Sequence, residues 1–250
     1  MEKYIIYNKD MYYLLKLKKI VIKLLTFWIF QINLRKNARN FLFYFSFKDY
    51  IKFKHQNFHI VSLGNDCMPR VLTTAIKLKP RKIYGEKTLP FDLCRSFELT
   101  KINKLIENDF ENYFDNLIIS EKFYPHDYKL TKEQFITRYK KRINNFIEIM
   151  HSEKMIYFIY ADFDNKNDAD NIIKLYSTLK NKRAHKPFKL IILTAKPLNI
   201  TNSNIIIIVE DLKIKNGNWV KSFINDYGNI NDDYSKFCNK VGKKLSDFIS

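Results

Sequence analysis

A cysteine at a predicted strand-to-helix junction is the residue of this sequence best placed for chemistry. In Val61-Ser-Leu-Gly-Asn-Asp-Cys-Met-Pro-Arg70 an apolar run ends at Gly64, and Cys67 precedes a predicted helix. Ligands of open α/β sheets collect at the carboxyl ends of strands. The partial positive charge of a helix N-terminus stabilises a thiolate there, and Arg70 adds a cation one turn further on. The alternative is that Cys67 is a small buried residue, as cysteines outside disulfides usually are.

A phosphate site at the same junction is a weaker interpretation. Backbone N–H groups at a helix start hold anions, but the segment contains one glycine only and matches neither the dinucleotide fingerprint nor the P-loop. Asp66 would also repel a phosphate. We therefore expect Asn65 or Asp66 to cap the helix, with Pro69 in its first turn, where proline is tolerated.

Two further segments supply groups that could act with a thiolate. The turn Thr88-Leu-Pro-Phe-Asp-Leu93 fixes a carboxylate at Asp92, which could orient a histidine, bind substrate or simply cap a helix. His126 lies in the turn-like segment Phe123-Tyr-Pro-His-Asp127 beside a carboxylate. A general base for a thiol needs a pKa near neutrality, so histidine fits best, although an isolated loop histidine is often without a role.

Arg138 and Arg142 share a helix face that either meets an anionic substrate or is simply solvated.

The order of these segments resembles a family of bacterial and viral proteins described as putative papain-like cysteine peptidases. The resemblance rests on Ser62-Leu-Gly-Asn-Asp-Cys67, Leu89-Pro-Phe-Asp92, Tyr124-Pro-His126, Arg138-Tyr-Lys-Lys-Arg-Ile143 and Met155-Ile-Tyr-Phe-Ile159, and it covers residues 58–210. Leu93 departs from it, because family members tend to carry an aromatic residue there.

The resemblance implies a hydrolase in which the thiolate of Cys67 attacks a carbonyl carbon and His126 is the base. Asp92 or Asp127 would orient the imidazole, and backbone N–H groups near Cys67 would stabilise the oxyanion. We expect Gly64, Asn65, Arg70 and Asp127 to bind substrate, a peptide or a glycan-related compound. We expect no metal and no cofactor.

The elements that must position these residues alternate between strands and helices. Apolar runs predict strands at 59–63, 155–160, 189–193 and 205–209, and helical spacing predicts helices over 67–78, 97–118, 131–151, 168–180 and 232–249. Thr131 and Gln134 form a predicted capping box. The pattern indicates an α/β fold with a mainly parallel sheet and helices on both faces, Rossmann-like and three-layered. Papain-like peptidases instead have a helical lobe and an antiparallel barrel.

Residues 1–57 form a basic, aromatic-rich helical extension before the α/β domain of residues 58–250. The chain carries a net charge of +18, and residues 1–57 hold twelve Lys/Arg against three Asp/Glu. This region either lies on an anionic membrane surface or packs as a helical hairpin on the main domain. Its apolar stretch 20–32 is too short to span a bilayer. Three cysteines in no metal-ligand pattern favour a reducing, cytoplasmic setting. If residues 1–57 bind membrane, the attachment is peripheral and at its inner face.

Two other functions remain open. A membrane-associated enzyme of surface-polysaccharide assembly, such as a glycosyltransferase for capsule or lipopolysaccharide, would use the basic N-terminus and Asp162-Phe-Asp164 after a strand. A non-enzymatic anion-binding protein would explain the charge. Nucleic acid is not a favoured partner, because no recognisable nucleic-acid-binding motif occurs.

Overall fold

The computed structural model describes residues 9–64, 67–95, 98–162, 169–210 and 233–249. Chain contacts divide the protein into two units. One contains residues 1–55 and 212–243, and the other contains residues 56–211 and 244–250. The predicted boundary after residue 57 lies close to the division at residue 55.

A four-stranded parallel sheet forms the second unit and confirms the α/β prediction. Its order is β1-β2-β3-β4. The strands are β1 (Phe58–Ser62), β2 (Met155–Asp162), β3 (Phe188–Thr194) and β4 (Ile205–Val209). In the register, Val61 lies opposite Phe158, which lies opposite Leu190. The described strands contain no antiparallel pairing of the kind that a papain-like barrel requires.

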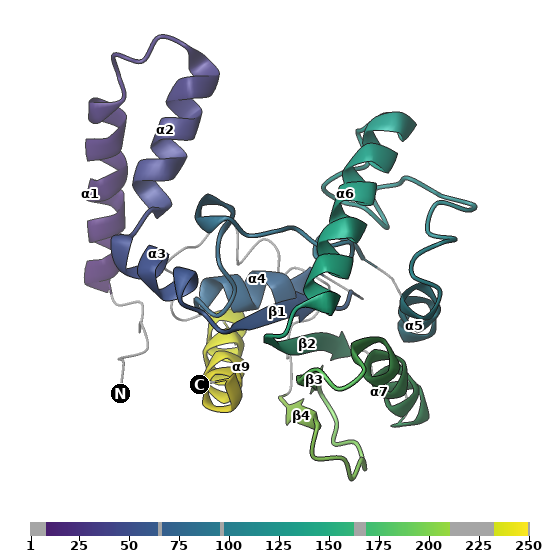
Figure 1. Ribbon diagram of the computed structural model, residues 1–250. Helices are drawn as coiled ribbons and strands as arrows, with labels where there is room; N and C mark the ends of the chain where they lie inside the picture. Colours follow the sequence, from purple (N-terminus) through teal and green to yellow (C-terminus); the bar gives the residue numbers. More distant parts are fainter. Residues whose placement is uncertain (1–8, 65–66, 96–97, 163–168, 211–232, 250) are drawn as a thin grey trace. The chain divides into compact units, whose positions relative to one another are not determined.

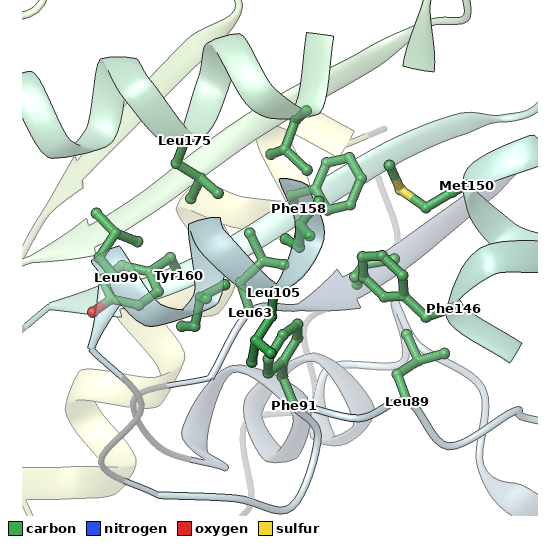
Figure 2. Packing of buried hydrophobic residues seen from close by; sticks show 14 of the residues in the cluster. Leu63, Leu89, Phe91, Leu99, Leu105, Phe146, Met150, Phe158, Tyr160 and Leu175 are labelled. Carbon is green, nitrogen blue, oxygen red and sulfur yellow. The ribbon is translucent and has the colours of Figure 1, made fainter. Parts of the chain in front are cut away.

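Helices of this unit cover one face of the sheet around the main hydrophobic core (Figure 1). They are α5 (Leu99–Glu107), α6 (Lys132–His151) and α7 (Ala169–Arg183). Figure 2 shows Phe158 and Tyr160 of β2 packed among Leu99 of α5, Phe146 of α6 and Leu175 of α7. The capping box is confirmed, since Thr131 and Gln134 exchange side-chain-to-backbone hydrogen bonds at the start of α6.

The opposite side of the sheet is also apolar. Side chains of alternating residues, including Ile60, Ile159, Ile191 and Ile208, are buried there. Helix α4 (Met68–Ala75) contacts β1 and β2. Burial of both faces explains why the strands are continuous apolar runs and do not alternate with polar residues.

Two of the predicted helices end earlier than expected, and the same motif ends both. After α4, the N–H of Leu78 donates to the Thr73 carbonyl at 2.9 Å, and Lys77 has a φ of 59°. After α5, the N–H of Phe110 donates to the Leu105 carbonyl at 2.8 Å, and Asp109 has a φ of 47°. These are Schellman motifs, in which glycine usually takes the left-handed position. Lysine and aspartate occupy it here, so the usual sequence signal is missing.

The first unit contains three helices from the N-terminal region. They are α1 (Lys9–Leu25), α2 (Ile32–Tyr44) and α3 (Phe47–Lys54). The second unit also contains a short 3-10 helix, η1 (Lys82–Tyr84). The predicted second helical segment is divided at Ser46, whose Oγ accepts from the Asp49 N–H at 3.3 Å and caps α3. Among the described residues, no helix is both long and apolar enough to cross a membrane. The last helix, α9 (Asp233–Ile249), is shared between the two units.

Candidate functional site

Cys67 lies directly before α4, at the carboxyl end of β1, as predicted. The β1 ladder continues to Leu63, whose N–H donates to the Ile159 carbonyl at 2.9 Å. Gly64 then takes a φ of 81°, a left-handed conformation that glycine adopts without steric cost. Asn65 and Asp66, the predicted caps, lie outside the described residues. The residue at the cap position is Cys67 itself, which makes no side-chain capping bond and is 3% exposed.

Asp92 is held in a tight turn, and its carboxylate is fully buried. The Leu89 N–H donates to Asp92 Oδ2 at 2.8 Å, and the Asp92 N–H donates back to the Leu89 carbonyl at 3.3 Å. Pro90 fits this turn because its φ is preset for the second position. The turn therefore fixes the carboxylate, as the sequence suggested, but Asp92 does not cap a helix.

Two cations and two carboxylates meet at this turn. We call Arg70, Lys79, Glu86 and Asp92 the buried charge cluster. Lys79 Nζ lies 2.7 Å from Asp92 Oδ1 and 3.6 Å from Glu86 Oε1. Arg70 binds Glu86 at 3.0 Å, and its Nε lies 3.6 Å from Asp92 Oδ2. The cluster is neutral in sum, which is how buried charges are tolerated.

Lys79 reaches the cluster because of the way α4 ends. The Schellman motif at Lys77 reverses the chain, and the Lys79 N–H, like that of Leu78, donates to the Thr73 carbonyl. Pro80 follows and disfavours helical geometry for the residue before it. A lysine side chain is thereby directed inward and is 3% exposed.

A second buried carboxylate, Asp127, is engaged by the helix α6. Its Oδ2 accepts from Arg142 at 2.7 Å and from the Tyr139 hydroxyl at 3.2 Å, while Oδ1 accepts from Arg138. The pKa of Asp127 is lowered, because the arginines outweigh the opposing effect of burial. The sequence predicts that the arginines of α6 either bind an anionic substrate or are solvated. Instead, Arg138 and Arg142 bind a carboxylate of the protein itself.

His126 is close enough to Asp127 for the carboxylate charge to act on its ring, but the two side chains make no hydrogen bond. Within the described residues, neither Asp92 nor Asp127 makes a hydrogen bond with its ring. Burial lowers the pKa of His126, Asp127 raises it, and the charges of Arg95, Arg70 and Arg142 lower it, with a net downward shift. The imidazole is therefore neutral at pH 7 and able to accept a proton.

Arg70 interacts electrostatically with both Cys67 and His126. Burial lowers the pKa of Arg70, but Asp92, Glu86 and the Cys67 thiolate outweigh burial and raise it. The same guanidinium is among the charges that lower the pKa of His126. A backbone bond from Arg95 N–H to the Phe123 carbonyl, 2.8 Å long, joins the turn of Asp92 to the loop of His126.

The other cysteine near this site is inert. Cys94 is fully buried, its thiol donates to the Phe91 carbonyl at 3.3 Å, and burial raises the pKa of the thiol well above its usual value. The charges of Asp92 and Cys67 act in the same direction. Cys94 therefore remains protonated.

The structure brings Arg70 within electrostatic range of Cys67, Asp92 and His126, and it gives Asp127 arginine partners on α6. Sequence reasoning missed Lys79 and Glu86. The Lys-Pro pair at 79–80 signalled the end of a helix, but nothing in the sequence signalled a buried lysine.

For the glycosyltransferase alternative, Asp162 is buried at the end of β2, and Asp164 lies outside the described residues. No cluster of metal-binding side chains occurs in the described ranges.

Comparison of the chain with protein-family models, curated proteins and solved structures found no match to any of them.

Proposed function

We propose that the protein is a cysteine-dependent hydrolase of the kind that its resemblance to putative papain-like cysteine peptidases implies. The observation that carries the proposal is the position of Arg70, whose charge acts on both the Cys67 thiol and the His126 ring. A fixed guanidinium favours a thiolate beside it and keeps the imidazole neutral. The reaction then begins from a neutral imidazole and a thiol whose proton it can accept, and the guanidinium stabilises the thiolate that this transfer forms.

The proposed reaction uses groups of this chain only. His126 accepts the thiol proton, and the Cys67 sulfur attacks the carbonyl carbon of a peptide or glycan-related substrate. Backbone N–H groups of the first turn of α4 stabilise the oxyanion. His126 returns the proton to the leaving group as the carbon–heteroatom bond breaks, and water then hydrolyses the thioester.

In this proposal Asp92 acts through Arg70. Its carboxylate is occupied by Lys79 and Leu89 as well as by the guanidinium, so it holds Arg70 in place without touching the imidazole. Asp127 favours the protonated imidazole through its charge alone. Gly64 and Asn65 are still proposed to bind substrate.

The proposal extends to the setting of the enzyme. Burial of both sheet faces supports a Rossmann-like three-layer arrangement, and the charge of residues 1–57 supports a basic extension at the inner face of a membrane. The chain would then work in the cytoplasm as a peripheral protein.

Alkylation of the three cysteines as a function of pH tests the thiolate. Iodoacetamide is added to the native chain, and mass spectrometry reads each cysteine separately. Cys238, half-buried, is the internal reference, and fully buried Cys94 is the unreactive control. We expect the rate at Cys67 to rise with a midpoint clearly below about 8.5, the value for an ordinary thiol.

Variants of Arg70 test whether its charge causes the low alkylation midpoint of Cys67. Arg70→Gln should move the Cys67 midpoint upward, whereas Arg70→Lys, which keeps the charge, should leave it close to the wild-type value. The proposal fails if the wild-type midpoint is no lower than that of Cys238. It fails equally if Cys67 is as unreactive as Cys94 across the whole range.

A further inference from the structure

The hairpin of α1 and α2 exposes an uncharged apolar end. The two helices lie side by side and are joined at one end by residues 26–31 (Figure 1). We call residues 24–34 the hairpin tip. Its sequence, Leu-Leu-Thr-Phe-Trp-Ile-Phe-Gln-Ile-Asn-Leu, contains no charged residue. Phe30 is 91% exposed, Phe27 is 76% exposed and Trp28 is 68% exposed.

Such a surface needs a partner. Soluble chains rarely leave contiguous apolar surface of this kind in water. Most of the exposed large apolar side chains of the described chain fall within residues 13–51, and only three of them lie elsewhere, at Ile118, Ile173 and Phe248. The exposed apolar surface is thus concentrated in the N-terminal helices.

Basic side chains surround the tip on both helices. We call Lys19, Lys23, Arg35, Lys36 and Arg39 the basic collar. Lys23 is in the last turn of α1 and Arg35 is in the first turn of α2, so the two helices present cations at a similar distance from the tip. No acidic residue occurs between Asp10 and Asp49. An apolar end below a ring of cations matches the hydrocarbon and anionic headgroup layers of one leaflet.

Several polar groups at the turn of the tip are satisfied internally, which lowers the cost of an apolar environment. Thr26 is buried, its hydroxyl donates to the Ile22 carbonyl at 2.8 Å, and it accepts from Arg39 Nε at 2.8 Å. The N–H groups of Phe27 and Ile29 donate to the carbonyls of Leu24 and Thr26. The turn can therefore leave water without stranding these groups.

A second cross-link makes the hairpin rigid. Lys18 Nζ donates to the Phe43 carbonyl at 2.7 Å and lies over the Phe43 ring. Together with the Thr26–Arg39 bond, it holds α1 and α2 together at two levels. A rigid hairpin keeps the tip presented at one end.

From these features we infer that the hairpin tip inserts end-on into one leaflet of an anionic bilayer, with the basic collar at the headgroups. This inference deepens the peripheral membrane association proposed above and is independent of the chemistry of Cys67. It differs from a helix lying flat, which would bury the whole length of α1. The body of α1 carries Lys16, Lys18, Lys19 and Lys23, whereas the tip carries no charge.

Vesicle flotation of the full chain tests the association. Phosphatidylcholine vesicles are compared with vesicles that also contain phosphatidylglycerol. We expect binding to the anionic vesicles, weakened by salt. Trp28→Ser with Phe30→Ser should lower the partition coefficient at least about tenfold, since each change removes a large apolar side chain from the part of the tip that enters the bilayer. The matched control replaces exposed apolar residues of the other unit, Ile118→Ser with Ile173→Ser, and should have no effect.

The collar is tested in the same assay. Lys23→Gln with Lys36→Gln should weaken binding to anionic vesicles, and the charge-matched control Lys132→Gln with Lys140→Gln on α6 should weaken it less. Equal partition to neutral and anionic vesicles would overturn the role of the collar. Self-association in sedimentation that disappears in the Trp28/Phe30 variant, without vesicle binding, would show that the tip meets a second copy of the chain and would overturn the inference.

Fluorescence quenching separates end-on insertion from a flat helix. In a Trp219→Phe background, Trp28 is the single tryptophan, and lipids brominated in their acyl chains should quench it. A companion variant, Trp28→Phe with Tyr13→Trp, places the only tryptophan far from the tip on α1. We expect little quenching there. Comparable quenching at both positions would refute end-on insertion while leaving membrane association intact, and the alkylation of Cys67 would be unchanged in every variant.

Discussion

Replacing Asp92 with asparagine tests the buried charge cluster most directly. The cluster contains two cations and two carboxylates, and the substitution leaves it with a net charge of +1 in a site where Lys79 and Asp92 are almost wholly excluded from water. Lys79 Nζ then keeps only Glu86, at 3.6 Å. Breaking a buried ion pair by removing one partner costs about 3–5 kcal/mol, so we expect Asp92→Asn to lower the free energy of unfolding by that amount.

A urea titration followed by circular dichroism measures this change. The matched control is Asp109→Asn, because Asp109 is exposed and bonds Lys182 at the surface. Surface pairs contribute up to about 1 kcal/mol, and asparagine tolerates the left-handed backbone of this position. We expect Asp109→Asn to change the unfolding free energy by less than about 1 kcal/mol.

A double variant identifies the cause of the loss. Lys79→Met alone leaves the cluster with a charge of −1, but Lys79→Met combined with Asp92→Asn restores neutrality. We expect the double variant to be more stable than the sum of the single effects by about 1–3 kcal/mol, in the range for residues in contact. Additive effects, or an Asp92→Asn cost no larger than that of Asp109→Asn, would refute the argument that charge balance stabilises the site.

Three further outcomes are expected. Asp127 has a lowered pKa and so stabilises the fold above the unfolded-state pKa of about 4. This contribution disappears as pH falls through the folded-state value, and acid unfolding of Asp127→Asn should lack that component. Lys77→Gly should raise the free energy of unfolding by about 0.5–1 kcal/mol in a urea titration, since its φ of 59° suits glycine; a loss of stability would contradict the Schellman assignment. Thr131→Ala should cost about 1 kcal/mol in the same assay by removing a capping bond at the start of α6, whereas an unchanged midpoint would show that the cap is dispensable.

The sheet was predictable because its signal is local. Runs such as Ile205–Val209 are too apolar and too short to be anything but buried strands when helical segments separate them. The capping box at Thr131 and the junction at Cys67 are also contained in a few neighbouring residues. Helix ends were less predictable, since Lys77 and Asp109 occupy left-handed positions that glycine usually marks.

Buried charges were not predictable, because their partners are distant in sequence. Arg183 ends α7 in a basic stretch and resembles a solvated residue, yet it is buried and donates to the carbonyls of Met150, Ser152, Lys154 and Pro187. Asp127 is likewise explained only by α6, which is placed against it in the fold. Tertiary contacts of this kind leave no periodic pattern in a single sequence.

The strand β4 has a consequence for the behaviour of the protein at high concentration. In the described part of the chain it pairs with β3 alone, and its sequence is four isoleucines and a valine. Segments of this composition stack readily into cross-β fibrils when their open edge is accessible. The Lys244 ammonium binds the Val209 carbonyl at 2.8 Å and Glu210 at 2.9 Å, and so places charge at the end of the strand. Charged groups at the end of an edge strand are one of the features that oppose such stacking.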